Sequence, residues 1–173
     1  MKLFAVYVGG RTATSRVELH DMCFAAGERI EDCYEDLYAQ WWGVPESLHI
    51  DSWAELACVD GYDVSLKPEP YGGEEKLWFV NLGGYDPHEF TELHRNVFVV
   101  APRTGKAKAR AIRMVDELWP SRHSDYDYEI ETMLCLKDIL KSKGLHIHLA
   151  PAAEVKPFTF NNGYHPIRKK EGG

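Results

Sequence analysis

Apolar residues recur along the chain in two similar series, and each series opens with a short apolar run that ends in two glycines. The runs are KLFAVYVGG, residues 2–10, and KLWFVNLGG, residues 76–84. β-Branched and aromatic residues dominate both, which is typical of buried strands, and each glycine pair predicts an exit turn with positive φ. A second apolar run follows each polar loop, so we expect further strands over 17–26 and 93–101.

A helical period follows the second strand in both series. Apolar residues spaced i, i+3, i+4 and i+7 form one stripe of an amphipathic helix. The first stripe comprises Ile30, Cys33, Tyr34, Leu37, Tyr38, Trp41 and Trp42. Gly43 and Pro45 end this helix. The second, thinner stripe comprises Ala107, Ala111, Val115 and Leu118.

Each series ends with two further strand-like runs. In the first, 52–59 and 62–66 flank Asp60-Gly61, a strong signal for a tight hairpin. In the second, 126–136 and 145–149 take these places with a longer connection. Each series therefore predicts a β-β-α-β-β unit with a four-stranded sheet.

The two series align without a gap. When residues 2–56 are set against 76–130, 14 of the 55 pairs are identical, whereas ordinary composition predicts roughly 6%, or about three. We interpret this as an internal duplication, with repeat one at 1–67, a linker at 68–75, repeat two at 76–149 and an extension at 150–173 that ends in disorder. The predicted fold is α+β: one pseudo-two-fold module of mainly antiparallel sheet with one helix per repeat. Every tryptophan is then expected in the core or between the repeats.

A set of motifs resembles a known family. The segments are KLFAVYVGG, VELHDMCF, LHIDSW and VDGYDVSL, with KLWFVNLGGY and a second ELH. They resemble a small bacterial family known only as a domain of unknown function, number 1543, whose domain occurs in one or two copies per chain. The family has no established activity, ligand or catalytic residue. The resemblance therefore implies a duplicated bacterial protein and no particular function.

Composition places the chain among ordinary globular proteins, with 45% hydrophobic and 27% charged residues among 173. No apolar run approaches the roughly 20 residues of a membrane helix, and the N-terminus lacks the features of a secretory signal. The four cysteines show no metal-binding spacing and are expected to be buried thiols. We therefore expect a cytoplasmic protein.

Charge is distributed unevenly between the halves. Residues 1–75 carry 5 Lys/Arg against 15 Asp/Glu, a net charge of −10, while residues 76–173 carry 15 against 12, a net charge of +3. This asymmetry favours association of the halves or of whole chains into a homo-oligomer. Positive charge is not concentrated on one element, so neither nucleic acid nor a membrane is an expected partner.

Polar residues that both repeats share are the best candidates for chemistry. In Glu-Leu-His the strand period of two places Glu and His on one face, and His-x-Asp behaves likewise. Imidazoles and carboxylates gathered in a cleft between the repeats would suit a divalent metal or acid–base work. The alternatives are that each residue caps a backbone group in its own repeat, or only binds a ligand. The candidates are Glu18, His20, His49, Asp51, Glu92, His94, His123 and Asp125.

Two weaker candidates lie in the second half. His146 and His148 share a strand face and could clip a metal ion. The segment with Arg103, Lys106 and Arg110 would suit a phosphate at a helix N-terminus, although it lacks the P-loop pattern.

The function that the sequence favours is a non-enzymatic ligand-binding or assembly module, with an unknown small ligand or protein as its partner. The alternative is a small metal-assisted or acid–base enzyme that uses the Glu/His pairs at the repeat interface. The sequence identifies neither a cofactor nor a metal and does not decide whether the protein is an enzyme.

Overall fold

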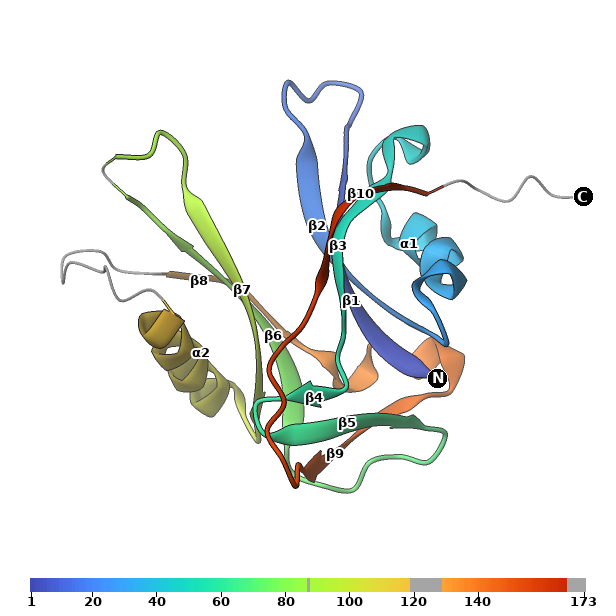
Figure 1. Cartoon of the computed structure of the whole chain (residues 1–173), viewed down its shortest axis with the longest axis vertical. Coiled ribbons are helices and arrows are strands. Elements are labelled where there is room, and N and C mark those ends of the chain that lie inside the picture. Colours follow the sequence, from blue (N-terminus) through green and yellow to red (C-terminus); the bar gives the residue numbers. More distant parts are fainter. Residues whose placement is uncertain (87, 119–128, 168–173) are drawn as a thin grey trace, which may run out of the picture. The chain divides into compact units, whose positions relative to one another are not determined.

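The structure is a computed structural model that describes residues 1–86, 88–118 and 129–167 (Figure 1). It has the predicted α+β class with antiparallel sheets. The chain divides into two compact units. Unit 1 comprises Met1–Cys58, Val64–Leu66 and the described residues from Lys156 onward, and unit 2 comprises Val59–Asp63 and Lys67–Val155. The expected pseudo-two-fold arrangement of the repeats stays a prediction, as does the disorder of residues 168–173, which lie outside the described chain.

Unit 1 is built on a four-stranded sheet of order β10-β3-β1-β2. Its strands are β1 (Lys2–Gly10), β2 (Leu19–Gly27), β3 (His49–Glu55) and β10 (Asn161–Pro166). The predicted first helix forms as a 3₁₀ turn, η1 (Ile30–Cys33), followed by α1 (Tyr34–Gln40); a second 3₁₀ turn, η2 (Pro45–Ser47), precedes β3. The C-terminal extension, which has no counterpart in the second half, therefore supplies the fourth strand.

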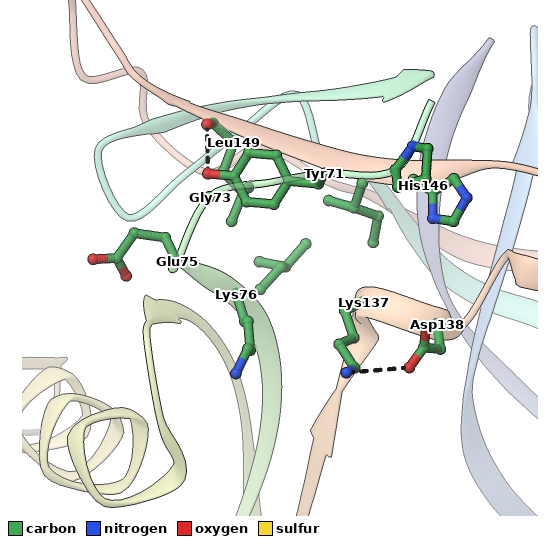
Figure 2. A pocket seen from close by; sticks show the side chains of 11 residues that line it. Tyr71, Gly73, Glu75, Lys76, Lys137, Asp138, His146 and Leu149 are labelled. Atoms are coloured by element: carbon green, nitrogen blue, oxygen red, sulfur yellow. Dashed lines mark hydrogen bonds and ion pairs between the residues drawn. The ribbon is translucent and has the colours of Figure 1, made fainter. Parts of the chain in front are cut away.

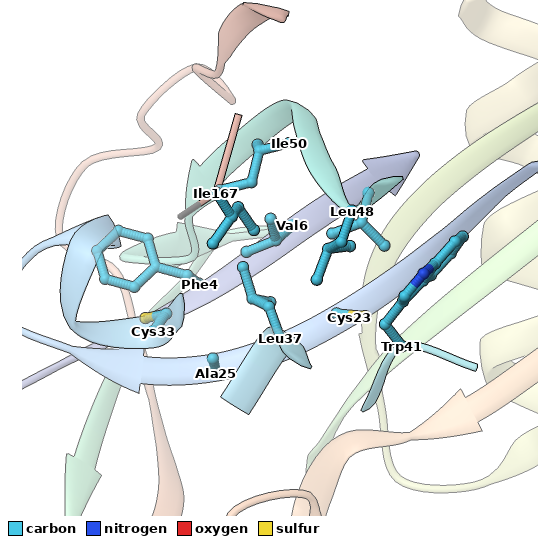
Figure 3. Close-up of a cluster of buried hydrophobic side chains, with 11 residues drawn as sticks. Phe4, Val6, Cys23, Ala25, Cys33, Leu37, Trp41, Leu48, Ile50 and Ile167 are labelled. Carbon is cyan, nitrogen blue, oxygen red and sulfur yellow. The ribbon is translucent and has the colours of Figure 1, made fainter. Parts of the chain in front are cut away.

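The core of unit 1 lies between the helix stripe and the sheet (Figure 3). Cys33 and Leu37 are fully buried against the apolar residues of β1 to β3. Ile167 enters the same cluster, and the Tyr38 hydroxyl donates to its carbonyl at 2.9 Å. Trp42 departs from the prediction: it is 55% exposed because the helix ends before it, and its indole N–H donates to the Asp21 carboxylate.

Unit 2 contains a three-stranded sheet of order β7-β6-β8. Its strands are β6 (Lys76–Gly84), β7 (Leu93–Ala101) and β8 (Glu129–Cys135), and α2 (Thr104–Leu118) follows β7. Three residues of the predicted α2 stripe, Ala107, Ala111 and Val115, lie in the core of this unit. Among the described residues no helix is both long and apolar enough to span a membrane.

The predicted hairpin at Asp60-Gly61 forms, with both residues at positive φ (54° and 81°). Its strands, β4 (Cys58–Val59) and β5 (Tyr62–Lys67), belong to a third sheet of order β4-β5-β9, where β9 spans His146–Pro151. The turns η3 (Leu136–Asp138) and η4 (Lys141–Lys143) precede β9. The expected four-stranded sheet within each repeat is therefore wrong, because β5 and β9 do not pair with β3 and β8.

The glycine pairs at the ends of β1 and β6 do not form the predicted turns. All four glycines lie inside the strands, and the described glycines with positive φ are Gly61, Gly144 and Gly163. Gly9 and Gly83 instead lie beneath polar side chains, with His49 and Asp51 next to Gly9 and with Glu131 and Glu92 next to Gly83.

Burial makes the Cys23 thiol resistant to ionisation. Burial, with a smaller contribution from the Asp21 charge, raises the pKa of Cys23 from 9.0 to about 12. The unfolded chain loses this proton near pH 9 while the folded chain keeps it, so folding stability is intact below pH 9 and falls between pH 9 and about 12. We expect Cys23→Ala to flatten this decline in urea unfolding measured from pH 8 to 11. An unchanged slope would contradict the assignment.

Candidate metal centre

Four polar side chains of unit 1 meet where β1 ends and β2 and β3 begin. Glu18 and His20 flank Leu19 at the start of β2, as the strand period predicts. The His20 Nε2 atom lies 3.2 Å from Asp51 Oδ2 and 3.8 Å from Glu18 Oε2. The His49 Nε2 atom lies 3.2 Å from Glu18 Oε1 and 3.4 Å from Asp51 Oδ1. Each imidazole thus faces both carboxylates.

The strand register explains why the two imidazoles converge. Gly9 on the central strand pairs with His20 on β2 and with His49 on β3, so the three residues form one row across the sheet. Adjacent strands are about 4.8 Å apart, and the two side chains can lean toward each other over a residue that has none. A β-carbon on Gly9 would lie 2.6 Å from His49 Nε2 and 2.7 Å from Asp51 Oδ2. The glycine therefore provides the space that the cluster occupies.

Asp51 reaches the cluster because it is the extra residue of a β-bulge. Ser52 pairs with Tyr7 and Ile50 pairs with Val8, so Asp51 has no partner on β1. A bulge re-aims side chains and is common beside functional sites. The displaced carboxylate is turned toward both imidazoles and remains 28% exposed.

His49 is the most constrained member of the cluster. Its side chain is 3% exposed, and its Nδ1 lies 2.9 Å from the Ser47 carbonyl oxygen. A carbonyl oxygen only accepts, so Nδ1 carries a proton, and Nε2 is the ring atom that is left to face the carboxylates. That buried Nε2 has no hydrogen-bond partner, and neither has Asp51 Oδ2, although both lie close to other polar atoms.

Two tyrosines frame the imidazoles. The Tyr7 ring stacks on His20 with centroids 5.2 Å apart and planes 3° from parallel. Burial, followed by the charges of Asp51 and Asp21, raises the pKa of the Tyr7 phenol, so it stays neutral beside the carboxylates. The Tyr164 ring of β10 lies against His49, with centroids 4.5 Å apart. Aromatic contacts therefore orient both rings.

A related cluster lies in unit 2. The His94 Nε2 atom is 3.1 Å from Glu131 Oε2 and 3.8 Å from Glu92 Oε2, and one ligand atom from each of the three residues lies within 4.8 Å of the others. A β-carbon on Gly83 would lie 2.6 Å from Glu131 Oε1 and 2.8 Å from Glu92 Oε1. Tyr85 hydrogen-bonds Glu92, whose charge raises the pKa of this phenol.

Glu131 joins Glu92 and His94 in the second cluster and was not among the predicted residues. Gly83 pairs with His94 on one side and Glu129 on the other, and the bulge of β8 falls at Glu131. The counterparts of His49 and Asp51 in the strand register are therefore Glu129 and Glu131, 80 residues later rather than 74. The predicted counterparts, His123 and Asp125, lie outside the described residues. A site shared between the repeats stays a prediction, because each described cluster is made within its own unit.

Two of the weaker candidates, His148 and Arg110, are engaged in other contacts. His148 Nε2 donates to the Glu69 carbonyl at 2.7 Å, which opposes a metal clip with His146. Arg110 pairs with the Asp60 carboxylate. Arg103 precedes α2, and Lys106 lies in its first turn. His146 lines a pocket of about 310 Å³ in unit 2, together with Tyr71, Lys76 and Lys137 (Figure 2).

Comparisons with known proteins relate one stretch of the chain to a family and nearly the whole chain to a solved structure. Residues 15–66 match the family DUF1543, a domain of unknown function. The matched stretch contains all four polar residues of the unit 1 cluster, which confirms the predicted resemblance for one copy; no second copy is matched. Among solved structures, the chain is similar to the protein Il1583 from Idiomarina loihiensis, with 29% identity, a TM-score of 0.74, and coverage of 97% of this chain and 99% of that one. No curated protein matches the chain.

Proposed function

We propose that this protein is a metal-binding module whose unit 1 holds a divalent transition-metal ion between Glu18, His20, His49 and Asp51. The observation that carries the proposal is the Nε2 atom of His49, which is buried and lies close to two carboxylates without a hydrogen bond. A lone pair facing two anions is unfavourable unless a cation lies between them.

The surroundings of His49 are those of a metal ligand. Metal-binding histidines donate their second ring N–H to a carbonyl or carboxylate, which fixes the tautomer and the ring orientation. The Ser47 carbonyl plays this part for Nδ1. A proton on Nε2 could also neutralise the cluster, but the carboxylate oxygens at 3.2 and 3.4 Å do not lie in hydrogen-bond geometry with that atom.

The ligand set indicates the class of ion. Imidazole suits zinc, iron, copper and nickel, whereas magnesium and calcium prefer all-oxygen sites. Two imidazoles with two carboxylates therefore favour an ion such as Zn²⁺ or Fe²⁺ over Mg²⁺ or Ca²⁺, with Mn²⁺ between these classes because carboxylates suit it. Among the described residues, the unit 2 cluster is the group whose three ligand atoms already lie within 4.8 Å of one another, so the unit 1 side chains must draw closer together to surround an ion. The unit 2 cluster has one imidazole, and its ligand side chains are 30–46% exposed, so we expect it to bind the same ions more weakly.

Zinc titration of EDTA-stripped full-length protein tests the proposal. We expect one tight Zn²⁺ per chain by calorimetry, and Asp51→Asn should weaken it by about 100-fold or more, since even indirect partners of metal ligands are worth 10–100-fold. Glu131→Gln, a matched loss of one carboxylate in unit 2, should leave this tight ion in place. A wild-type chain that binds neither Zn²⁺, Fe²⁺ nor Mn²⁺ would overturn the proposal.

The metal-free protein provides an independent test of the cluster's charge state. If His49 is neutral, the Asp51 carboxylate repels the lone pair on His49 Nε2. Asp51→Asn then removes this repulsion, and the melting temperature should rise. If His49 is instead an imidazolium paired with Asp51, the same substitution removes an attraction and the melting temperature should fall. Thermal unfolding in EDTA separates the two.

A metal-assisted enzyme is the second candidate. Glu18 and His20 have side chains that are 48% and 35% exposed, so a bound ion would have a solvent-facing side. Zinc sites that retain an open position activate water for attack on esters and phosphoesters. Turnover of such test substrates by the zinc-loaded protein and not by Asp51→Asn would support this candidate, and equal background rates would exclude it for those substrates.

We also infer that the two units descend from one duplicated β-β-α-β segment, whose copies we expect to be related by a pseudo-two-fold axis. The order β2-β1-β3 repeats as β7-β6-β8, and the pairing of Gly9 with His20 repeats 74 residues later as Gly83 with His94. A bulge lies next to the cluster in both. This supports a paired polar centre as an ancestral property of the unit.

A further inference from the structure

We infer that the C-terminal strand β10 is part of the metal centre, and that Tyr164 is the positioning residue that holds the His49 imidazole in place. The inference rests on the proposed metal site. It concerns a segment that lies outside the stretch matched by the family DUF1543 and that is paired with β3 beside the cluster.

The strand is anchored on both sides of Tyr164. Before it, Asn161 and Asn162 pair with Trp53 and Ser52 of β3. After it, His165 and Pro166 pair with Ile50 and His49, and the following Ile167 is buried in the unit 1 core. These two attachments fix the position of the short segment between them.

That segment departs from the ladder opposite Asp51. The pairing passes from Asn162–Ser52 directly to His165–Ile50, so Gly163 and Tyr164 face the single residue Asp51. Gly163 has φ of 133°, a conformation that residues with a side chain rarely adopt. The ladder of β3 is thus interrupted toward β10 as well as toward β1, and both interruptions occur at the same carboxylate.

The interruption brings the Tyr164 ring over His49. The ring centroids are 4.5 Å apart and the planes are inclined by 39°. Tyr164 is itself 68% exposed while His49 is 3% exposed, so the tyrosine gains little burial and instead shields the histidine. An aromatic ring held against an imidazole limits its rotation and excludes water from that side.

Unit 2 lacks such a cover in the part of the chain that the structure describes. There β8 pairs with β6 alone, and its edge residues carry a more exposed cluster. The contrast associates β10 with the centre that contains the buried imidazole. Because supporting contacts of metal ligands govern how firmly the ion is held, the Tyr164 ring should slow the departure of the ion.

The test compares three full-length variants loaded with Zn²⁺ and mixed with excess EDTA in a stopped-flow instrument. Tyr164→Ala should release zinc about 10-fold faster or more, whereas Tyr164→Phe, which keeps the ring, should stay within about twofold of wild type. Phe160→Ala removes an aromatic of similar exposure, 60%, from the residue just before β10 and should not change the rate. Equal release rates for Tyr164→Ala and wild type would overturn the inference.

A second readout needs no metal, so it separates failure of this inference from failure of the proposed function. Nitrogen-15 NMR of the His49 ring in EDTA should show the Nδ1–H tautomer alone in wild type and in Tyr164→Phe. Tyr164→Ala should show a mixture, because the ring is no longer held toward the Ser47 carbonyl. An unmixed tautomer in Tyr164→Ala would overturn the positioning role even if zinc binds elsewhere or not at all.

Discussion

Replacing Gly9 with alanine is expected to lower zinc affinity by about 100-fold or more while the chain stays folded. The new methyl group would occupy space 2.6 Å from His49 Nε2 and 2.7 Å from Asp51 Oδ2, closer than such carbon atoms approach in folded proteins. His49 is packed on all sides and cannot retreat, so Asp51 must leave the cluster. Gly9 lies in a strand without positive φ, and alanine therefore fits the backbone itself. Calorimetric zinc titration measures the loss, and circular dichroism verifies the fold.

Gly83→Ala is the matched control. Its methyl group would displace Glu131 and Glu92 in unit 2 in the same manner, at 2.6 and 2.8 Å. We expect this variant to retain the tight zinc ion of unit 1 and to lose only the weaker binding of unit 2. Wild-type zinc affinity in Gly9→Ala would show that the cluster does not coordinate metal over this glycine.

Replacing Leu37 with alanine is expected to lower the free energy of unfolding by about 2–5 kcal/mol, the usual cost of a large cavity in a core. Leu37 is completely buried and meets residues of α1, the sheet and the C-terminal Ile167 (Figure 3). The cavity would open beside β3, the strand that carries His49 and Asp51. Urea unfolding of the metal-free protein measures the change.

Leu134→Ala is the control for this substitution. Leu134 lies on β8 and is 38% exposed, so its truncation leaves little cavity and should change stability by about 0.5 kcal/mol. Equal losses in the two variants would show that the helix stripe is not the main support of the unit 1 core.

The local elements of this chain could be predicted because their signals are local. Apolar runs of β-branched and aromatic residues located β1, β2, β6 and β7, and the i, i+3, i+4 stripe located both helices. Sheet membership was less accessible. The sequences of the short strands β5 and β9 do not indicate which strands they pair with, because strand pairing depends on contacts between residues far apart in the sequence. The strand β10 was missed because its residues, NNGYHP, lack the apolar alternation of a strand.

The candidate site was half predictable for a similar reason. Two pairs of candidates, Glu18 with His20 and His49 with Asp51, are each two residues apart in the sequence. The strand period of two therefore places the members of each pair on one face. Glu131 was missed because the gapless alignment sets Asp51 against Asp125, whereas the bulge of β8 sets it against Glu131, six residues later. Asp125 itself lies outside the described residues. The alternation of charged and apolar residues in EIETMLC is the signal that could have located it.

The bulge at Asp51 has a consequence for how such a centre can arise or disappear. Asp51 is one residue more than β1 needs to remain in register with β3. Removing that residue would leave Ser52 opposite Tyr7, Ile50 opposite Val8 and His49 opposite Gly9, so the ladder would become regular and His49 would keep its face. The cluster would lose only the carboxylate that both imidazoles share. A regular antiparallel sheet and a sheet with this cluster therefore differ by a single codon. Deletion of that codon would remove a proposed metal ligand and would preserve the hydrogen-bonded strands that support the site.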